Sequence, residues 1–335
     1  MYSPQDYKLV AMSRSTLIDV EYNQGIHVLD SILWLDAPRQ TDLCFVSHAH
    51  IDPVGPHRKI LATGATAALI HSRIGRGKSL TTPFHRRFSL GELDLELHPA
   101  GHMLGSAQIR ITRDGASLVY TGDFQLGRTR TAKPAAVLEC DVLVMRATYG
   151  LPRHVFPDRE EVEAEMVSWA HRTLQDDNQP VVFASALGKA QELASIFLAH
   201  DLRVRVHKSI YKVCRAYRAL GVQLPDIRCL RLSPGKAEVI IFPAHLRQSK
   251  AIAKLKRARA CVATGRVLDE ADDLADAAFA LSGHADHPAL LRYARESGAK
   301  RIRLTGPAAA PLAAELAAAG LDASPLQPSE QMKLF

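Results

Sequence analysis

Apolar and polar residues alternate in short runs along the first third of the chain, which predicts antiparallel β-strands. Residues 16–21, 26–29 and 32–36 alternate over a few positions each, and turn residues such as Asn, Gly and Pro separate them. Residues 92–98, Glu-Leu-Asp-Leu-Glu-Leu-His, alternate strictly, as expected of a strand with one face toward a core. Residues 43–46, Leu-Cys-Phe-Val, are continuously apolar, which predicts a buried strand.

Beyond residue 150 the pattern changes to helices that alternate with short apolar strands. A helical period over residues 159–174 is followed by predicted strands at 181–184, 204–207, 239–242 and 261–264. Strands that alternate with helices are typical of a parallel α/β unit. The chain then returns to the first unit through four predicted elements: a strand at 278–282, a helix at 288–297, a strand at 300–305 and a helix at 308–319.

The bulk composition limits the partners and the location. The 335 residues carry a net charge of +7, which suits a phosphate-rich partner and equally an ordinary basic protein. No apolar run approaches the roughly 20 residues of a membrane span, and the N-terminus lacks the pattern of a signal peptide. Five scattered cysteines without a Cys-x-x-Cys pair indicate reduced thiols in a cytoplasmic protein with no membrane partner.

Metal-type side chains stand at the ends of three predicted strands. His48, His50 and Asp52 follow the apolar run at 43–46 and share one face of an extended segment. His102 lies in a glycine-containing loop after the strand at 92–98, and Asp123 follows a short apolar run at 117–120. Imidazole and carboxylate groups together suit a zinc-type divalent metal. One such residue in a loop is usually a cap or a turn residue, but three strand ends together favour a metal site.

Residues 48–53 resemble the H-x-H-x-D-H signature of the metallo-β-lactamase superfamily, with Pro53 in place of the last histidine. His-Pro-Ala-Gly-His-x-Leu-Gly-Ser-Ala-Gln at 98–108 and Thr-Gly-Asp-Phe at 121–124 resemble later motifs of its β-CASP branch, which contains DNA and RNA nucleases. The amino-acid sequences of three segments, 147–152, 183–191 and 280–286, are most similar to those of the bacterial DNA-ligase-associated exonuclease group. The resemblance covers nearly the whole chain from about residue 14.

This resemblance implies a fold and a domain organisation. The expected fold is α/β (α+β): an αββα metallo-β-lactamase sandwich with an inserted α/β β-CASP cap domain. Residues 1–151 and 269–335 are expected to form the sandwich, and residues 152–268 the cap. The strand at 278–282 is then expected to belong to the sandwich.

The resemblance also implies one complete metal site and one incomplete one. His48, His50, His102 and Asp123 match the ligands of a first divalent metal, Zn or Mn. A second metal is not expected, since Pro53 and Gly306 stand where its histidine ligands would be. Its two carboxylates, Asp52 and Asp123, remain.

The implied catalytic residues are His284, as proton donor, and Asp52. The family places a glutamate that orients the histidine at the position of Arg146. Arg146 is therefore the third departure from the family pattern, after Pro53 and Gly306. His57 and His287 stand at no matching position, so they are poor substitutes for the missing ligands.

Basic clusters suggest a groove for a nucleic-acid backbone, although any one cluster alone is better explained as a solvated helix face. Arg146, Lys189, Lys208 and Lys212 are the expected contacts to DNA or RNA, bound as a single strand or at an end. Tyr211 interleaves with the cluster that contains Lys208 and Lys212.

Three functions are compatible with these residues. The first is a nucleic-acid-binding pseudoenzyme or scaffold in DNA or RNA processing, including DNA repair, with an active nuclease or a ligase as protein partner. The second is a working single-metal exonuclease. The third is a small-molecule metallo-hydrolase, against which the β-CASP-like segments argue. Whether the chain is an enzyme is open at this point, because three expected site residues are replaced.

Overall fold

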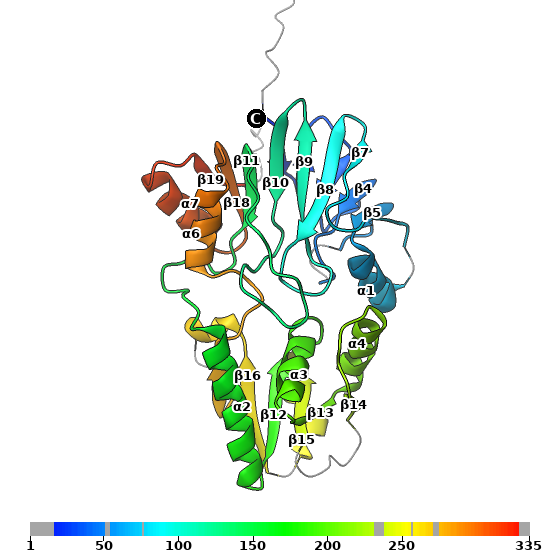
Figure 1. Ribbon diagram of the computed structural model, residues 1–335, viewed down its shortest axis with the longest axis vertical. Coiled ribbons are helices and arrows are strands. Elements are labelled where there is room, and N and C mark those ends of the chain that lie inside the picture. Colours follow the sequence, from blue (N-terminus) through cyan, green and yellow to red (C-terminus); the bar gives the residue numbers. More distant parts are fainter. Residues whose placement is uncertain are drawn as a thin grey trace, which may run out of the picture.

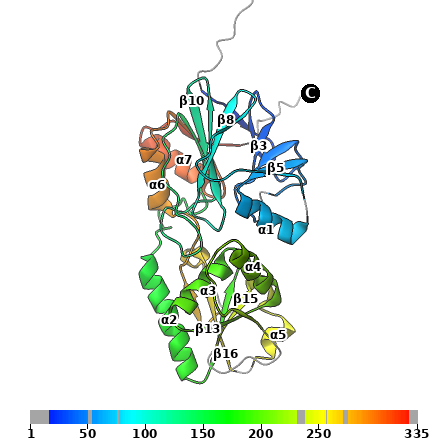
Figure 2. The same ribbon diagram turned by 45° about the vertical axis from the view of Figure 1, so that its right-hand side comes forward.

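The computed structural model describes residues 17–50, 54–75, 77–230, 238–255, 257–270 and 275–327. These residues form two lobes (Figure 1). The first lobe contains two facing β-sheets, and the second contains a third sheet covered by helices; a turned view separates the same two lobes (Figure 2). None of the described helices is long and apolar enough to cross a membrane.

The first sheet of the first lobe has the order β1-β2-β3-β4-β5-β6. Its first three strands pair antiparallel, and the rest pair parallel. The strands are β1 (Val20–Tyr22), β2 (Ile26–Val28), β3 (Leu33–Leu35), β4 (Leu43–Phe45), β5 (Lys59–Ala62) and β6 (Ser79–Thr81). All three residues of β4 are buried, which confirms the predicted buried strand.

The second sheet has the order β19-β18-β11-β10-β9-β8-β7. β7 to β10 form an antiparallel meander, and β10, β11, β18 and β19 pair parallel. The strands are β7 (Phe88–Leu90), β8 (Leu93–Pro99), β9 (Ala107–Arg113), β10 (Ala116–Tyr120), β11 (Val142–Arg146), β18 (Arg301–Thr305) and β19 (Ala323–Pro325). In β8 the leucines are buried and the residues between them are not, as the strict alternation predicts.

The two sheets pack face to face around one apolar core, to which Phe45, Leu95, Ile109 and Tyr120 contribute. Helix α1 (Gly64–Ile74) covers the outer face of the first sheet, and α6 (His287–Glu296) and α7 (Ala309–Ala318) cover the outer face of the second (Figure 1). The expected α/β fold with a helix-covered double sheet is therefore confirmed.

The second lobe is built on a parallel sheet of order β14-β13-β15-β12-β16-β17. Its strands are β12 (Gln179–Ala184), β13 (Arg203–Val206), β14 (Arg228–Cys229), β15 (Glu238–Pro243), β16 (Ala258–Ala263) and β17 (Ala277–Phe279). Its helices are α2 (Arg159–Gln175), α3 (Lys189–Ala199), α4 (Lys208–Ala219), α5 (Lys250–Ala253) and the 3₁₀ turns η1 (Ala244–Leu246) and η2 (Gly265–Leu268).

One predicted strand lies in the other lobe. β17 was expected in the sandwich, but it pairs parallel with β16 and so completes the sheet of the second lobe. Its apolar run satisfies either sheet, and the pairing depends on long-range contacts that the local pattern does not encode. The second-lobe sheet therefore continues past residue 269, and the division at 152 and 268 stays a prediction.

Glu192 of α3 ties the two lobes together. Its carboxylate, nearly buried, accepts hydrogen bonds from the backbone N–H groups of Arg130 (2.8 Å) and Thr131 (3.0 Å) in the first lobe. It also accepts one from the Thr131 hydroxyl (2.6 Å) and pairs with Arg159 of α2 (2.5 Å). Arg130 and Arg159 both also pair with Glu163, so these side chains form one network across the junction.

Candidate metal centre and cleft

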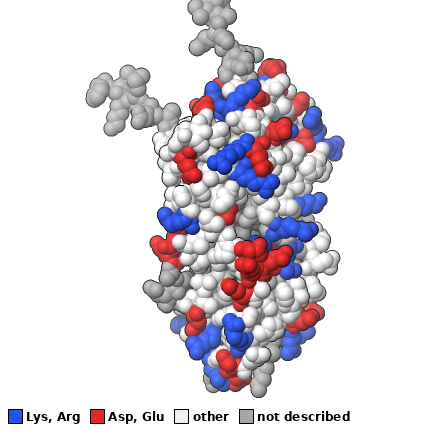
Figure 3. Space-filling view, turned by 60° about the vertical axis from the view of Figure 1, so that its left-hand side comes forward, with Lys and Arg blue, Asp and Glu red and all other residues white. Residues whose placement is uncertain are grey.

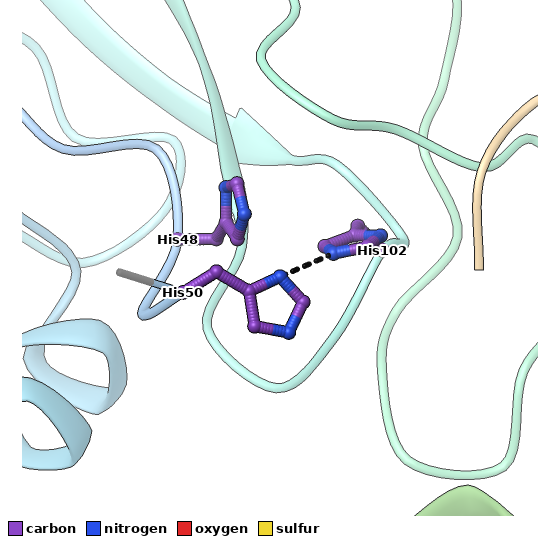
Figure 4. Close-up of side chains that lie close together, drawn as sticks. All are labelled: His48, His50 and His102. Carbon is purple, nitrogen blue, oxygen red and sulfur yellow. Dashed lines mark hydrogen bonds between the residues drawn. The ribbon is translucent and has the colours of Figure 1, made fainter. Parts of the chain in front are cut away.

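Three strand ends of the first lobe converge beside the junction of the lobes. His48 and His50 follow β4, His102 follows β8, and Asp123 follows β10. The three imidazoles face one another (Figure 4), with ring centroids 4.8 to 5.0 Å apart. The structure thus brings together the four residues for which the sequence predicts a shared metal. We refer to them as the histidine centre.

The donor atoms of the histidine centre can be assigned from the contacts. Nε2 of His102 lies 3.2 Å from Nδ1 of His50, and Nε2 of His48 lies 3.5 Å from Oδ2 of Asp123. The nitrogen atoms that point inward are therefore Nε2 of His48, Nδ1 of His50 and Nε2 of His102. Three neutral imidazoles and one carboxylate form a reasonable ligand set for a zinc-type ion.

Each outward ring nitrogen of the centre has its own partner. Nδ1 of His102 lies 2.9 Å from the carbonyl oxygen of Gly283, and Nε2 of His50 lies 3.2 Å from that of Leu187. Nδ1 of His48 lies 2.9 Å from the hydroxyl of Ser47. A carbonyl can only accept, so Nδ1 of His102 and Nε2 of His50 carry protons, an arrangement typical of metal ligands held by outer partners.

This tautomer assignment tests whether the residues fit a metal. A neutral imidazole has one protonated nitrogen. The inward nitrogens of His50 and His102 therefore present lone pairs to each other across 3.2 Å. Two facing acceptors repel, and a cation between them removes the repulsion. The donor set thus fits a divalent metal better than it fits a hydrogen-bonded cluster.

The electrostatics keep the three histidines neutral. Burial lowers the pKa of His50 and lowers the pKa of His102 well below its usual value, and it brings the pKa of His48 to about 3. Burial alone would raise the pKa of Asp123, but the neighbouring His284 and Arg146 side chains hold that pKa well below its usual range. Neutral imidazoles beside an ionised carboxylate are ready to coordinate without losing protons.

Asp36 supports the centre and was missed by the sequence argument. It follows β3, accepts hydrogen bonds from the N–H (2.7 Å) and hydroxyl (2.6 Å) of Ser47, and accepts a third from Tyr120 (2.8 Å). Because Ser47 contacts His48, Asp36 orients the His48 side chain through Ser47. The sequence could have indicated Asp36, because its carboxylate directly follows the strand at 33–35. This strand is the fourth whose end is followed by a residue of a type that binds metals.

The other side of Asp123 faces a cation. Nε of Arg146, the last residue of β11, lies 2.7 Å from Oδ1 of Asp123, and Nδ1 of His284 lies 3.6 Å from the same oxygen. Asp123 therefore directs Oδ2 to the histidine centre and Oδ1 to Arg146. Of the three predicted departures, Arg146 is thus in contact with the centre. Asp52 and Pro53 lie outside the described residues.

Gly306 follows β18 with φ +95°, a backbone conformation that side chains other than glycine rarely adopt. A Cβ placed there would lie 2.9 Å from the carbonyl oxygen of Ala147 and 3.4 Å from Cγ of Arg146. A histidine at this position would therefore be strained and would require the neighbouring backbone to shift.

A cleft of about 1790 Å³ opens between the lobes beside the centre. His50, His102, Asp123, Arg146 and His284 line its first-lobe wall. The lining includes seven basic side chains against three acidic ones; the basic ones are Arg73, Arg146, Arg159, Lys189, Lys212, Arg247 and Arg266. By contrast, basic and acidic side chains are interspersed on the outer face in Figure 3. The basic excess of the cleft suits a polyanion.

The predicted backbone-binding lysines differ in position. Lys212 of α4 is exposed and lines the cleft, whereas Lys208 at the start of the same helix is exposed but is not among the lining residues. Lys189 lines the cleft, and its ammonium group donates to the carbonyl of Leu281. Burial lowers the pKa of Lys189 to about 7. Lys189 therefore also holds α3 to the segment that leads to His284.

Comparison with known proteins gives related sequences, although no family model matches the chain. The chain is 34% identical over 322 residues to a "Probable DNA ligase" of Opitutus terrae, covering 94% of this chain and 32% of that protein. It is 28% identical to an "RNase J-like protein" of Methanocaldococcus jannaschii, covering 53% and 50%, and 25% identical to "Cleavage and polyadenylation specificity factor 73" of Drosophila melanogaster, covering 61% and 36%. The chain thus spans between a third and a half of these relatives.

A solved structure has a similar fold. A protein of unknown function from Enterococcus faecalis superposes with a TM-score of 0.56 at 14% identity, covering 78% of this chain and 74% of the other.

Proposed function

The chain belongs to the β-CASP branch of the metallo-β-lactamase superfamily, and from this membership we propose that it binds nucleic acid in its cleft beside a single-metal centre and hydrolyses it weakly or not at all. The observation that carries the proposal is the 2.7 Å contact between Arg146 and Asp123. It places a guanidinium on the side of the carboxylate that faces away from the histidine centre. A guanidinium supplies positive charge, as a second metal ion would. Unlike a metal ion, it has no coordination position for a ligand.

The residues of the centre and of the cleft have different proposed roles. A divalent metal held by His48, His50, His102 and Asp123 would polarise a phosphoryl oxygen as a Lewis acid. Arg146 and the basic cleft residues attract and position the phosphate backbone. His284, 3.6 Å from Asp123, can hold a proton at Nδ1. We propose no second metal, and so no two-metal clamp on both the attacking and the leaving oxygen.

A working single-metal phosphodiesterase is the second candidate. Its support is the complete ligand set together with His284 at the edge of the centre. It predicts metal-dependent cleavage that disappears in His102→Ala and in His284→Ala. A small-molecule hydrolase fits less well, because the cleft of about 1790 Å³ exceeds the roughly 300–1,000 Å³ typical of small-ligand pockets.

The proposal extends to partners and location. A DNA ligase is a proposed protein partner, because the Opitutus relative is called a probable DNA ligase and matches this chain over only 32% of its own length. A cytoplasmic location is supported by five free cysteines.

Binding and cleavage assays at two salt concentrations test the proposal. Labelled single-stranded DNA, single-stranded RNA and duplex DNA are titrated at 50 and 200 mM salt, with Mn²⁺ or Zn²⁺ present. We expect affinity to fall steeply with salt, because each neutralised phosphate releases counterions, and we expect little or no cleavage. Cleavage that depends on His102 and His284 would support the second candidate instead, and the absence of binding at low salt would reject both.

Lys212→Ala is expected to reduce the slope of log affinity against log salt by about 0.7 for a single strand, the contribution of one phosphate contact. Lys208→Ala is the matched control, because it removes the same charge from the same helix outside the cleft lining. Equal effects of the two variants would show that general charge, and not the cleft, determines binding.

Arg146→Glu is expected to increase the metal content by up to one equivalent relative to the unmodified chain. The change removes the cation from Oδ1 of Asp123 and places a second carboxylate near His284. Arg146→Met removes the charge without adding a ligand and should add no metal. Gly306 is left unchanged because of its positive φ. Identical metal content in all three proteins, measured by elemental analysis, would mean that Arg146 does not exclude the second metal.

A further inference from the structure

A second cluster of side chains that could bind a metal lies on the outer face of the second sheet and shares no residue with the histidine centre. His85, Glu96 and His98 have one donor atom each within 4.8 Å of the others. Glu96 and His98 lie two residues apart on β8, so both point to the same face of the strand. His85 lies before β7, in the connection that leads from β6.

The backbone holds His85 over this pair. The N–H of His85 donates a hydrogen bond of 2.8 Å to the carbonyl oxygen of Leu97, the residue between Glu96 and His98. His85 itself has φ +63°, a left-handed conformation that residues other than glycine rarely adopt. The result is an edge-to-face arrangement of the His85 and His98 rings, 5.0 Å between centroids.

The donor atoms of the cluster are turned toward one another. Nε2 of His98 lies 3.4 Å from Oε1 of Glu96. It is buried and makes no hydrogen bond to any residue that the structure describes. Oε2 of Glu96 is held by Nε of Arg87 at 3.0 Å, which leaves Oε1 directed at the histidines. Arg87 thereby acts as the kind of outer partner that fixes a ligating carboxylate.

From this geometry we infer that His85, Glu96 and His98 form a second, independent site for a divalent first-row transition metal. Two imidazoles and a carboxylate are a ligand set with open positions for water. A bound ion would also give the buried Nε2 of His98 a partner. The positive charge of Arg87 opposes the ion only weakly, because that side chain is 79% exposed and screened by solvent.

The site would tie the connection at residues 82–87 to β8, and β8 leads within four residues to His102. In Figure 1, β8 runs toward the junction of the lobes. An ion at this position therefore stabilises the strand that presents a ligand of the histidine centre, without itself contributing to that centre.

Zinc titration of the tag-free, metal-depleted full chain tests this site, with a chromophoric chelator as competitor. We expect two equivalents of Zn²⁺ per chain. His98→Asn and His85→Ala should each weaken one equivalent by more than about 100-fold, because loss of a direct ligand costs more than the 10- to 100-fold typical of an outer partner. The same equivalent should persist in His102→Ala, so failure of the histidine centre would not be mistaken for failure of this site.

His27→Asn is the matched control. His27 also lies beside a carboxylate, with Nδ1 3.1 Å from Oε1 of Glu21, but no second histidine among the described residues completes that pair. It should bind zinc like the unmodified chain. The inference is overturned if both His98→Asn and His85→Ala, shown to be folded by circular dichroism, retain the full zinc capacity and affinity. It is also overturned if His27→Asn removes the same equivalent.

Discussion

His102→Ala is expected to lose one equivalent of zinc per chain, with the affinity of that site lowered by more than about 100-fold. His102 contributes Nε2 to the histidine centre and fixes its ring through the carbonyl of Gly283, so alanine removes a ligand and its orientation together. The unmodified chain should gain about 2.7 kcal/mol of stability at a zinc concentration 100 times the dissociation constant of the centre. The variant should gain less than about 0.4 kcal/mol from this centre at the same zinc concentration.

His245→Ala is the control for the loss at His102. It removes an exposed histidine that lines the same cleft but belongs to none of the donor clusters among the described residues. Its zinc content and its thermal stabilisation by zinc should match those of the unmodified chain. Undiminished zinc binding by His102→Ala, measured by elemental analysis and differential scanning calorimetry, would contradict the assignment of the centre.

Glu192→Gln is expected to lower the free energy of unfolding by about 3 kcal/mol, because it leaves buried donors and a guanidinium without their carboxylate. Glutamine has nearly the shape of glutamate, so the loss reports charge and hydrogen bonding rather than volume. It can accept at one oxygen only, whereas Glu192 uses both. Its Oε1 accepts from the N–H of Arg130 and pairs with Arg159, and its Oε2 accepts from the N–H and hydroxyl of Thr131. Urea denaturation followed by circular dichroism measures the difference.

The position of Glu192 also predicts which residues lose protection from hydrogen exchange in Glu192→Gln. Amide hydrogen exchange should rise at Arg130 and Thr131 in the first lobe, because their N–H groups lose the acceptor. Glu165→Gln, an exposed residue of α2, should change the stability by less than about 0.5 kcal/mol. Equal stability of the Glu192 and Glu165 variants would show that this network does not hold the lobes together.

Local patterns in the sequence were sufficient for most of the first lobe, and they placed His48, His102 and Asp123 after strand ends that the structure brings together. Strict alternation fixed the faces of β8, and the residues that follow β4, β8 and β10 are next to one another because the ends of these strands meet at one edge. The lobe to which β17 belongs was not predictable, since its short apolar run fits either sheet. Long-range packing selects between such alternatives.

The contacts between charged side chains could not be predicted from the sequence either. Arg146 was predicted to contact phosphate, or simply to stand where the family has an orienting glutamate. Its contact with Oδ1 of Asp123 depends on how β11 and β10 lie beside each other, which the sequence does not show. The cluster around His98 was hidden for a different reason. Glu96 and His98 share a face by simple alternation, but His85 joins them only through the turn that its positive φ permits.

The hydrogen bonds of the outward ring nitrogens connect the centre to the second lobe from two directions. Nε2 of His50 reaches the carbonyl of Leu187 within that lobe, and Nδ1 of His102 reaches that of Gly283, on the segment by which the chain returns to the sandwich. If the centre binds a metal as proposed, the free energy of metal binding and the position of the second lobe would be coupled through these two hydrogen bonds, and such coupling is reciprocal. A nucleic acid that draws the lobes together would tighten the hold on the metal, and removal of the metal would weaken the grip on the nucleic acid to the same degree.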